Sequence, residues 1–536
     1  MRCSDLWAVV FLSSIVMSAA ALAAQEPAGR APLRQAAYLK ASNPGMFDHF
    51  GEGGALDGHS GNSVAISADG STIAVGAQHE SSGARGINAN QDDDSAYDAG
   101  AVYVFTRTGN TWAPQAYIKA SNADVGDQFG NVIALSADGN TLAVGAFSES
   151  SAATGVNANQ NDNSLPQAGA VYVFTRSGAT WTQQAYIKAS NTGRAAAGDT
   201  FGDGDQFGFS LALSEDGNTL AVGAVSEDSM ADGSNSNQHD DSFTSAGAVY
   251  VFARNGNTWA QQAYLKADAS TNTVLGDQFG YAMSLSANGN TLAVGVYDES
   301  GSGRTVNAPI NRQRNGSGAV YIFVRSGTTW TREVYLKTWN AEGGDSWGSS
   351  VALSADGNTL AVGSLDEDCL CPGVHTDPGV GAVDQKSDTS SGAAAVFVRN
   401  GTTWTQQAYI KASNPGQGDW FGVRLALSSD GSTLAVGAQN EDGATRNING
   451  PQNDDATEAG AVYVFTRTGT AWTPLAYVKG ANTDAYDEFG GSVALTRDGR
   501  TLVVGARGED SGARGVNGNQ ADNSVDEAGA VYVFTR

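Results

Sequence analysis

The polar loops of this sequence carry Asn and Asp at alternate positions, a spacing that suits a metal ion. One such loop contains Asn88, Asn90, Asp92 and Asp94. Oxygen ligands at every second residue can wrap around Ca2+, which takes about six to eight oxygens. The alternative is that these side chains accept hydrogen bonds from nearby backbone and hold the loop in turns. The candidate calcium ligands are Asp92, Asp94, Asp162, Asp240, Asp241, Asp454, Asp455 and Asp522.

A second set of carboxylates stands two residues before a recurring Phe-Gly or Trp-Gly pair. The set is Asp48, Asp127, Asp205, Asp277, Asp345, Asp419 and Asp487. If the Phe-Gly segments lie close to a common axis, these carboxylates could ring the mouth of a central channel and hold a cation. The alternative is that each Asp caps the turn in which it lies, because a feature shared by all copies is most simply part of the repeated unit.

One loop departs from the acidic pattern of the others and carries three arginines. Arg304, Arg312 and Arg314 lie in a stretch with few carboxylates. Arg can hold a carboxylate or phosphate through two parallel hydrogen bonds, so these residues are candidates for binding an anionic group on a ligand. The alternative is that they form ion pairs with the acidic residues 366–368 in the next long loop.

Signals of catalysis or transition-metal binding are few. Cys369, Cys371 and His375 could bind a metal, but no fourth ligand is evident, and a local disulfide or two free thiols are the alternatives. The five histidines do not recur from copy to copy, and no nucleophile motif stands out. We therefore expect that the chain is not an enzyme, although fold alone excludes no activity.

Four short phrases, repeated in fixed order, must position all of these residues. In one copy they are FGNVIALS, NTLAVGA, GAVYVF and the TW…QAYIK phrase. Each is rich in Val, Leu, Tyr and Phe and is bounded by turn residues, which is typical of strands. SADGN and TRSGAT connect the first to the second phrase and the third to the fourth as tight hairpins. The sequence therefore predicts a four-stranded antiparallel meander, with strands A to D from the inside outward.

Seven copies of this unit predict an all-β, seven-bladed β-propeller. The last copy ends on its strand C, and QAAYLKAS at 35–42 has the sequence of the missing strand D. We expect this N-terminal strand to complete the last blade and close the ring, which removes an exposed strand edge. The blades are predicted at about 43–121, 122–190, 191–268, 269–339, 340–413, 414–481, and 482–536 together with 35–42.

The recurring FG…VGA units resemble FG-GAP repeats, which form the seven-bladed propeller at the N-terminus of integrin α chains. The resemblance covers nearly all of residues 35–536. It implies a propeller that binds a partner outside the cytoplasm, with adhesion as the best-known role. Many FG-GAP repeats carry a calcium loop between the FG and GAP strands, but here that segment is only ALSADGNT, with Asp138 as its one carboxylate. We expect hairpin turns, and no calcium, at these positions.

The long connections of an antiparallel meander all fall on one face of the propeller. These are the B–C loops and the D–A links, whereas the tight A–B and C–D hairpins lie on the other face. Long loops in a compact fold are usually functional, so we expect the B–C loop face to bind the partner. An exported binding or adhesion module is therefore the predicted function, and a secreted hydrolase or lectin with a site on the same face is the alternative.

Composition and the N-terminus indicate where the chain acts. The 536 residues carry a net charge of -26, which disfavours binding to nucleic acid or anionic membranes. Arg2, an apolar run at 6–17 and the small residues of 21–23 predict a signal peptide at 1–23, followed by a linker at 24–34. We expect a monomer without a membrane span that is secreted, periplasmic or on the cell surface, and whose partner is an extracellular or cell-surface protein or glycan.

Overall fold

The computed structural model describes residues 32–52, 61–193, 204–229, 233–239, 242–267, 276–311, 313–378 and 389–536. Residues 1–30 and 31–536 are separate units, and the described residues belong to the second unit. The predicted signal peptide at 1–23 and most of the linker at 24–34 lie outside the described residues. In the described part of the chain, no helix has the length and hydropathy to cross a membrane.

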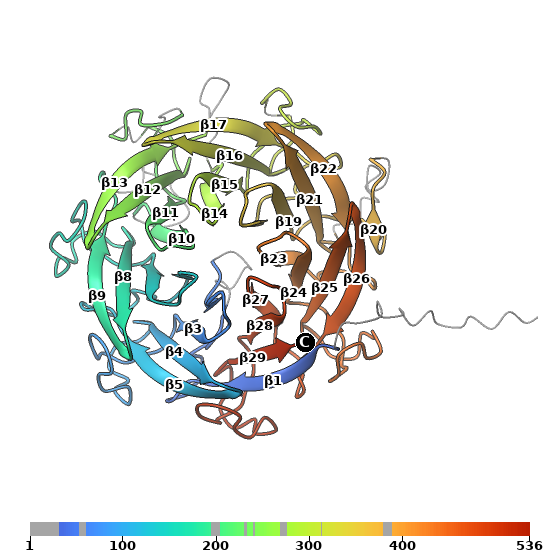
Figure 1. Cartoon of the computed structure of the whole chain (residues 1–536). Coiled ribbons are helices and arrows are strands. Elements are labelled where there is room, and N and C mark those ends of the chain that lie inside the picture. The colour runs from blue at the N-terminus through green and yellow to red at the C-terminus, as the bar shows by residue number, and fades with distance from the viewer. Residues whose placement is uncertain are drawn as a thin grey trace, which may run out of the picture. The chain divides into compact units, whose positions relative to one another are not determined.

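The described residues form seven antiparallel sheets arranged as the blades of a propeller (Figure 1). Blade 1 contains β2 (Val64–Ile66), β3 (Thr72–Ala77), β4 (Ala101–Thr108) and β5 (Thr111–Ile118), and blade 2 contains β6 (Ile133–Leu135), β7 (Thr141–Ala146), β8 (Ala170–Ser177) and β9 (Thr180–Ile187). Blade 3 contains β10 (Phe207–Leu213), β11 (Thr219–Ala224), β12 (Ala248–Asn255) and β13 (Thr258–Leu265), and blade 4 contains β14 (Phe279–Leu285), β15 (Thr291–Val296), β16 (Ala319–Ser326) and β17 (Thr329–Leu336).

The remaining strands complete three further blades. Blade 5 contains β18 (Ser350–Leu353), β19 (Thr359–Ser364), β20 (Val374–His375), β21 (Ala393–Asn400) and β22 (Thr403–Ile410), and blade 6 contains β23 (Phe421–Leu427), β24 (Thr433–Ala438), β25 (Ala461–Thr468) and β26 (Ala471–Val478). Blade 7 contains β27 (Phe489–Leu495), β28 (Thr501–Ala506), β29 (Ala530–Thr535) and β1 (Arg34–Leu39). The predicted all-β, seven-bladed architecture is confirmed.

The N-terminal strand closes the last blade, as the sequence predicts. β1 pairs antiparallel with β29, with Tyr38 opposite Tyr532, so the strand order is β1-β29-β28-β27. Figure 1 shows β1 in blue beside β29 in red. Because Tyr38 and Leu39 are fully buried, the two ends of the chain share one hydrophobic core.

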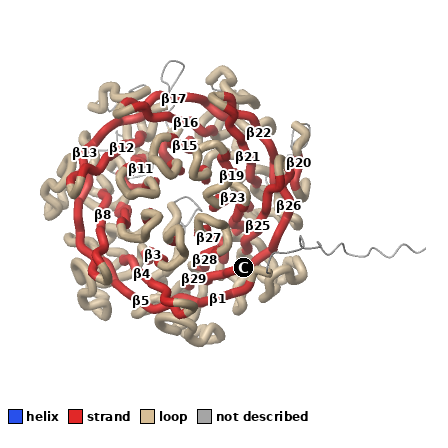
Figure 2. The backbone as a smooth tube through the Cα atoms, in the orientation of Figure 1, coloured by secondary structure: helices blue, strands red, loops and turns tan. Residues whose placement is uncertain are grey.

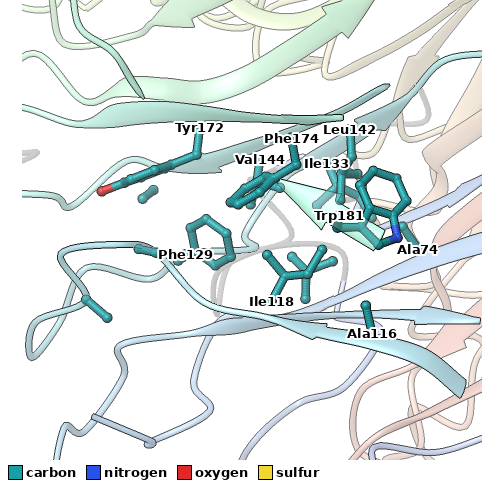
Figure 3. Packing of buried hydrophobic residues seen from close by; sticks show 14 of the residues in the cluster. Ala74, Ala116, Ile118, Phe129, Ile133, Leu142, Val144, Tyr172, Phe174 and Trp181 are labelled. Atoms are coloured by element: carbon teal, nitrogen blue, oxygen red, sulfur yellow. The ribbon is translucent and has the colours of Figure 1, made fainter. Parts of the chain in front are cut away.

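Apolar residues pack between adjacent blades because the second strand of each blade is covered on both faces. All six residues of β7 are buried. Leu142 and Val144 from this strand belong to a cluster that also contains Phe129 and Ile118, the latter from blade 1 (Figure 3). Burying each such side chain stabilises the fold by about 1.5–3 kcal/mol.

Blade 5 departs from the predicted four strands, because β20 pairs with β22 as a fifth, outer strand. In other blades the B–C loop makes a single bridge at the same place, for example between Ile87 and Ile118. The B–C loops therefore return along the end of the outermost strand, and Figure 2 shows loops at the rim of the ring. The four-strand prediction holds for the other six blades.

Each blade contains a buried ion pair that the sequence analysis missed. In blade 1, Glu80 at the start of the B–C loop accepts hydrogen bonds of 2.8 Å from the Nζ of Lys119 and from the hydroxyl of Tyr117. The repeated pairs, with N–O distances of 2.7–3.1 Å, are Lys40–Glu509, Lys119–Glu80, Lys188–Glu149, Lys266–Glu227, Lys337–Glu299, Lys411–Glu367 and Lys479–Glu441. In blade 7 the lysine comes from the N-terminal segment, so closure also completes this pair.

Candidate functional site

The first Asn of the alternating loop series has a structural role. The backbone N–H of Asn88 donates to the carbonyl of Tyr117 at 2.7 Å, and its Oδ1 accepts from the backbone N–H of Tyr117 at 3.0 Å. Asn157 and Tyr186 repeat this arrangement. These contacts anchor the B–C loop to strand D, which is the alternative that the sequence left open for Asn.

The candidate calcium ligands in the same loops are mostly at the surface. Asp92, Asp94, Asp454 and Asp455 are exposed, whereas Asp162 and Asp522 are half-buried. Asp162 accepts hydrogen bonds from the backbone N–H groups of residues 152 and 164, at 3.1 and 3.2 Å. Asp240 and Asp241 lie outside the described residues.

The aspartates that precede the Phe-Gly pairs cap turns. The carboxylate of Asp127 accepts a hydrogen bond of 2.9 Å from the backbone N–H of Asp124. The same type of contact, at 2.6–2.9 Å, is made by Asp48, Asp205, Asp345, Asp419 and Asp487. Asp277 is half-buried and lies at the equivalent position. These contacts favour the turn-capping interpretation over a ring of cation ligands.

The capping aspartates give an expected pH dependence of stability. Burial raises the pKa of Asp127 to about 7, of Asp419 to about 7 and of Asp487 to about 8, although the capped backbone N–H lowers it. The folded protein therefore retains protons that the unfolded chain, with an Asp pKa of about 3.9, releases. The stability that these three aspartates contribute to the folded protein is fully present below about pH 4, and it is lost as the pH rises through 7–8.

We therefore expect the melting temperature to fall between about pH 5 and pH 8.5. Replacing Asp127, Asp419 and Asp487 with Asn keeps a cap acceptor and removes the titration, so the variant's melting temperature should change less over this range. Thermal melts of both proteins in one buffer series at constant ionic strength test this. A variant with the same pH slope as the parent would show that other groups cause it.

The arginines of the fourth loop have an internal partner that differs from the predicted one. Arg304 and Arg314 both pair with Glu342 in the link between blades 4 and 5, and the second pair has an N–O distance of 3.2 Å. The acids at 366–368 are used elsewhere: for example, Glu367 pairs with Lys411. The ion pairs that the structure describes for Arg304 and Arg314 are thus with Glu342. Arg312 lies outside the described residues.

The two cysteines of the fifth loop form a disulfide, Cys369–Cys371. His375 bonds through Nε2 to the carbonyl of Cys371 at 3.2 Å. Of the alternatives that the sequence left open, the structure has the disulfide, in which neither sulfur is a thiolate that could bind a metal.

A polar cluster that the sequence analysis did not single out lies where blade 7 meets blade 1. We call His49, Glu52, Gln78, His79, Gln439, Glu488 and Arg507 the axial cluster. They lie before the innermost strands β2 and β27 or directly after the second strands β3, β24 and β28 of blades 1, 6 and 7. Glu52 is its centre. Its Oε2 lies 3.2 Å from Nδ1 of His49, 3.5 Å from Nε2 of His79 and 2.8 Å from Nε2 of Gln78. Its Oε1 lies 3.2 Å from Nη1 of Arg507.

A second carboxylate holds the outer nitrogen of each histidine. Nε2 of His49 lies 2.8 Å from Glu527, and Nδ1 of His79 lies 2.9 Å from Asp98. Arg507 also binds Glu488 through Nη2 at 2.6 Å. Burial alone would lower the pKa of His49, but its hydrogen bonds with Glu52 and Glu527 outweigh burial and raise it. Burial would raise the pKa of Glu52, but the two histidines and Arg507 lower it.

The inner part of blades 2 to 4 is aromatic. Phe147, Phe209, Val225 and Tyr281 form a buried cluster from blades 2 to 4, and the ring of Tyr281 stacks on Tyr297 at 4.7 Å. Strands of blades 2 to 6, together with residues 61–62 just before β2, line a cavity of about 100 Å³ beside this cluster. The inner part of the propeller is therefore asymmetric, with polar residues at blades 7 and 1 and aromatic residues at blades 2 to 4.

The sequence contained a signal for the axial cluster. The residue before each Phe-Gly or Trp-Gly pair differs between copies: it is His49 in blade 1 but Gln128, Gln206 and Gln278 in blades 2 to 4. All four adopt positive φ, from 53° to 57°. At a position where the backbone conformation is the same in these blades, the side chain can vary from blade to blade without changing the fold.

Two exposed aromatic residues stand at a position that suits glycine. Phe47 and Tyr486 directly precede capping aspartates and have φ of 63° and 67°. The equivalent residues Gly126, Gly344 and Gly418 have φ of 80–92°. Positive φ costs a residue other than Gly about 1–2 kcal/mol. Phe47 is 47% exposed and Tyr486 is 59% exposed, so burial does not offset this cost fully.

The other large exposed apolar residues of the described chain lie on the same face. They are Met46, Tyr97, Val125 and Leu370, all in B–C loops or D–A links. Gly126, next to Val125, donates a backbone hydrogen bond of 2.9 Å to the carbonyl of Tyr97. The rings of Phe47 and His49 lie 6.4 Å apart, edge to face. The exposed apolar residues around blades 7, 1 and 2 therefore adjoin the axial cluster.

These features define a class of protein, a seven-bladed β-propeller with an apolar surface beside a polar axial cluster. Three segments, residues 112–174, 404–465 and 472–534, match the FG-GAP repeat. The first runs from strand D of blade 1 to strand C of blade 2, the same unit that the sequence repeats around the ring. The chain is thus a seven-bladed propeller that contains three segments matching the FG-GAP repeat, which is consistent with a propeller like that of integrin α chains.

Several solved structures match this chain over most of its length. A chain of a mitotic checkpoint complex has 12% identity and a TM-score of 0.43, covering 93% of this chain and 95% of that chain. The WD40 repeats of RRP9 have 10% identity and a TM-score of 0.45, covering 93% and 100%. The periplasmic gluconolactonase PpgL of Pseudomonas aeruginosa has 13% identity and a TM-score of 0.43, covering 78% and 86%. Among curated proteins, no sequence matches this chain.

Proposed function

We propose that this chain is an exported binding module of the adhesion type, which engages an extracellular or cell-surface protein or glycan through its B–C loop face. The observation that carries this proposal is the pair Phe47 and Tyr486. Both are exposed aromatic residues in a backbone conformation that equivalent links fill with Gly. Strained conformations that the fold does not need occur preferentially at functional sites.

The surroundings of these residues support a binding surface. Exposed apolar side chains grouped on one face are typical of contact sites, and Tyr and Phe are enriched at interfaces. Met46, Tyr97 and Val125 extend the apolar surface next to Phe47 and around blades 1 and 2. The net charge of -26 favours a partner whose own surface is basic around an apolar centre.

The test compares binding with stability. Replacing Phe47 and Tyr486 with Gly should leave the melting temperature unchanged or higher, because Gly relieves the positive φ. Binding to the partner found on an array of extracellular proteins and glycans should weaken at least about 10-fold, as for loss of interface hot spots. Binding that survives in the double Gly variant contradicts the proposal.

A matched control comes from the link between blades 5 and 6. Gly418 has φ of 80°, and a Cβ atom there would meet nothing within 4 Å. Gly418→Tyr should therefore introduce the same strain in another link and lower the melting temperature without changing binding. If Gly418→Tyr weakens binding as much as the loss of Phe47 and Tyr486, the effect is not specific to that surface.

Calcium dependence forms part of the proposal. The exposed carboxylates of Asp92, Asp94, Asp454 and Asp455 lie in the same loops. Extracellular calcium modules bind in the range of about 10⁻⁴–10⁻³ M. Array binding in millimolar calcium is therefore compared with binding in sodium chloride of equal ionic strength. Equal binding in both solutions would mean that the loop carboxylates contribute only their negative charge and not a calcium site.

A further inference from the structure

We propose that His49, Glu52 and His79 bind one Zn2+ ion at the seam between blades 7 and 1. This site adjoins the proposed binding face, but its three ligands are neither the exposed apolar residues of that face nor the candidate calcium ligands. Two imidazoles and one carboxylate are a ligand set that zinc uses with water as the fourth ligand. Imidazole nitrogen is a poor ligand for calcium, which prefers oxygen, so the metal expected here differs from that expected in the loops.

The distances fit a tetrahedral site. For metal–ligand bonds of about 2.1 Å, tetrahedral geometry separates any two ligand atoms by about 3.4 Å. Oε2 of Glu52 lies 3.2 Å from Nδ1 of His49 and 3.5 Å from Nε2 of His79. The ligand atoms of all three residues lie within 4.8 Å of one another. A small closing movement of the two rings would bring all three atoms to a common centre.

The groups behind the ligands have the arrangement of an outer coordination shell. A metal-binding His usually donates its other ring N–H to a carboxylate, which fixes the ring and its tautomer. Nε2 of His49 has this contact with Glu527, and Nδ1 of His79 has it with Asp98. In each ring, the nitrogen that faces Glu52 is therefore left as the ligand.

The charge balance also favours a dication. Glu52, Glu527 and Asp98 contact the two histidines, and Arg507 pairs with Glu52 and with a fourth carboxylate, Glu488. Arg507 binds Oε1 of Glu52, whereas both histidines face Oε2. The arginine therefore orients the carboxylate and leaves the other oxygen for the metal.

The ligand set belongs to one blade, although the repeat occurs in all seven. At the position of His79, blades 2 and 3 have Ser148 and Ser226, and at the position of His49, blade 2 has Gln128. His49→Gln and His79→Ser therefore introduce residues that the same backbone already carries elsewhere. Both variants should fold, so that a loss of zinc binding reports the ligand itself.

The experiment titrates the EDTA-treated mature chain, free of any histidine tag, with Zn2+ in a calorimeter and with Co2+ in a spectrophotometer. We expect one equivalent of zinc and the visible absorption of tetrahedral cobalt. His49→Gln and His79→Ser should each weaken zinc binding by more than about 100-fold, and Asp98→Asn by about 10-fold, as for loss of an outer-shell partner. The exposed His239, replaced with Gln, serves as control and should leave binding unchanged.

Three results would overturn the proposal: the absence of one-to-one zinc binding, equal zinc affinity in the parent and both ligand variants, or displacement of zinc by an equal concentration of calcium. Melting curves without metal check that the variants are folded. Zinc should raise the melting temperature of the parent and not that of His79→Ser. Because none of these readouts uses a binding partner, failure here leaves the proposed binding function untouched.

Discussion

A chain that lacks residues 35–42 is expected to lose its single cooperative unfolding transition or to dimerise by strand exchange. The deletion leaves β29 as an open edge where β1 now pairs, and exposed edges recruit strands from other molecules. It also removes Tyr38 and Leu39 from the core. In addition, Glu509 loses both Lys40 and the hydroxyl of Tyr38, its partners at 2.8 and 2.7 Å.

Light scattering and denaturant unfolding measure the outcome. The control is a chain that begins at residue 32, which keeps every described residue and should match the parent. A synthetic peptide of residues 32–42, added to the chain that lacks residues 35–42, should restore a monomer and a sharper unfolding transition. A truncated chain that remains monomeric and unfolds like the control would mean that β1 is dispensable for closure.

Breaking a single buried ion pair within a blade should have the second largest effect. Lys188→Met leaves Glu149 buried without its cation, which lies 2.9 Å away in the parent. Removing one partner of a buried pair costs about 3–5 kcal/mol, because the other charge remains desolvated. We expect the free energy of unfolding to fall by this amount, measured in guanidinium chloride.

The double variant Lys188→Met with Glu149→Gln identifies the cause. Gln is neutral, and its oxygen can still accept the hydrogen bond that the hydroxyl of Tyr186 makes at 2.9 Å. If the unpaired charge is responsible, the double variant should regain most of the lost stability. A double variant that is no more stable than Lys188→Met would instead point to lost packing around the lysine stem.

The repeated side chains could be identified from the sequence, but the contacts between them could not be predicted from it. Tyr, Lys, the turn-capping Asp and the equivalents of Glu149 recur in the sequence of each copy. The sequence does not show, however, that Lys188 contacts Glu149, which is 39 positions away. The Arg–Glu342 pairs were missed for the same reason. A long loop can meet the neighbouring link or the next long loop, and only the folded backbone selects between Glu342 and the acids at 366–368.

The sequence by itself determined the strands, their order, the number of blades and the closure by residues 35–42. These follow from local preferences and from burial with a fixed period, both of which are written into every copy. Only the tertiary structure decided the axial cluster. Its central contact joins Glu52 to Arg507, which are 455 positions apart in sequence and meet because the ring closes. In a repeat protein the repeated pattern specifies the blades. Contacts between the first and last blades form only when the ring closes in three dimensions. The residues that differ between copies are therefore brought together as a site only in the folded structure.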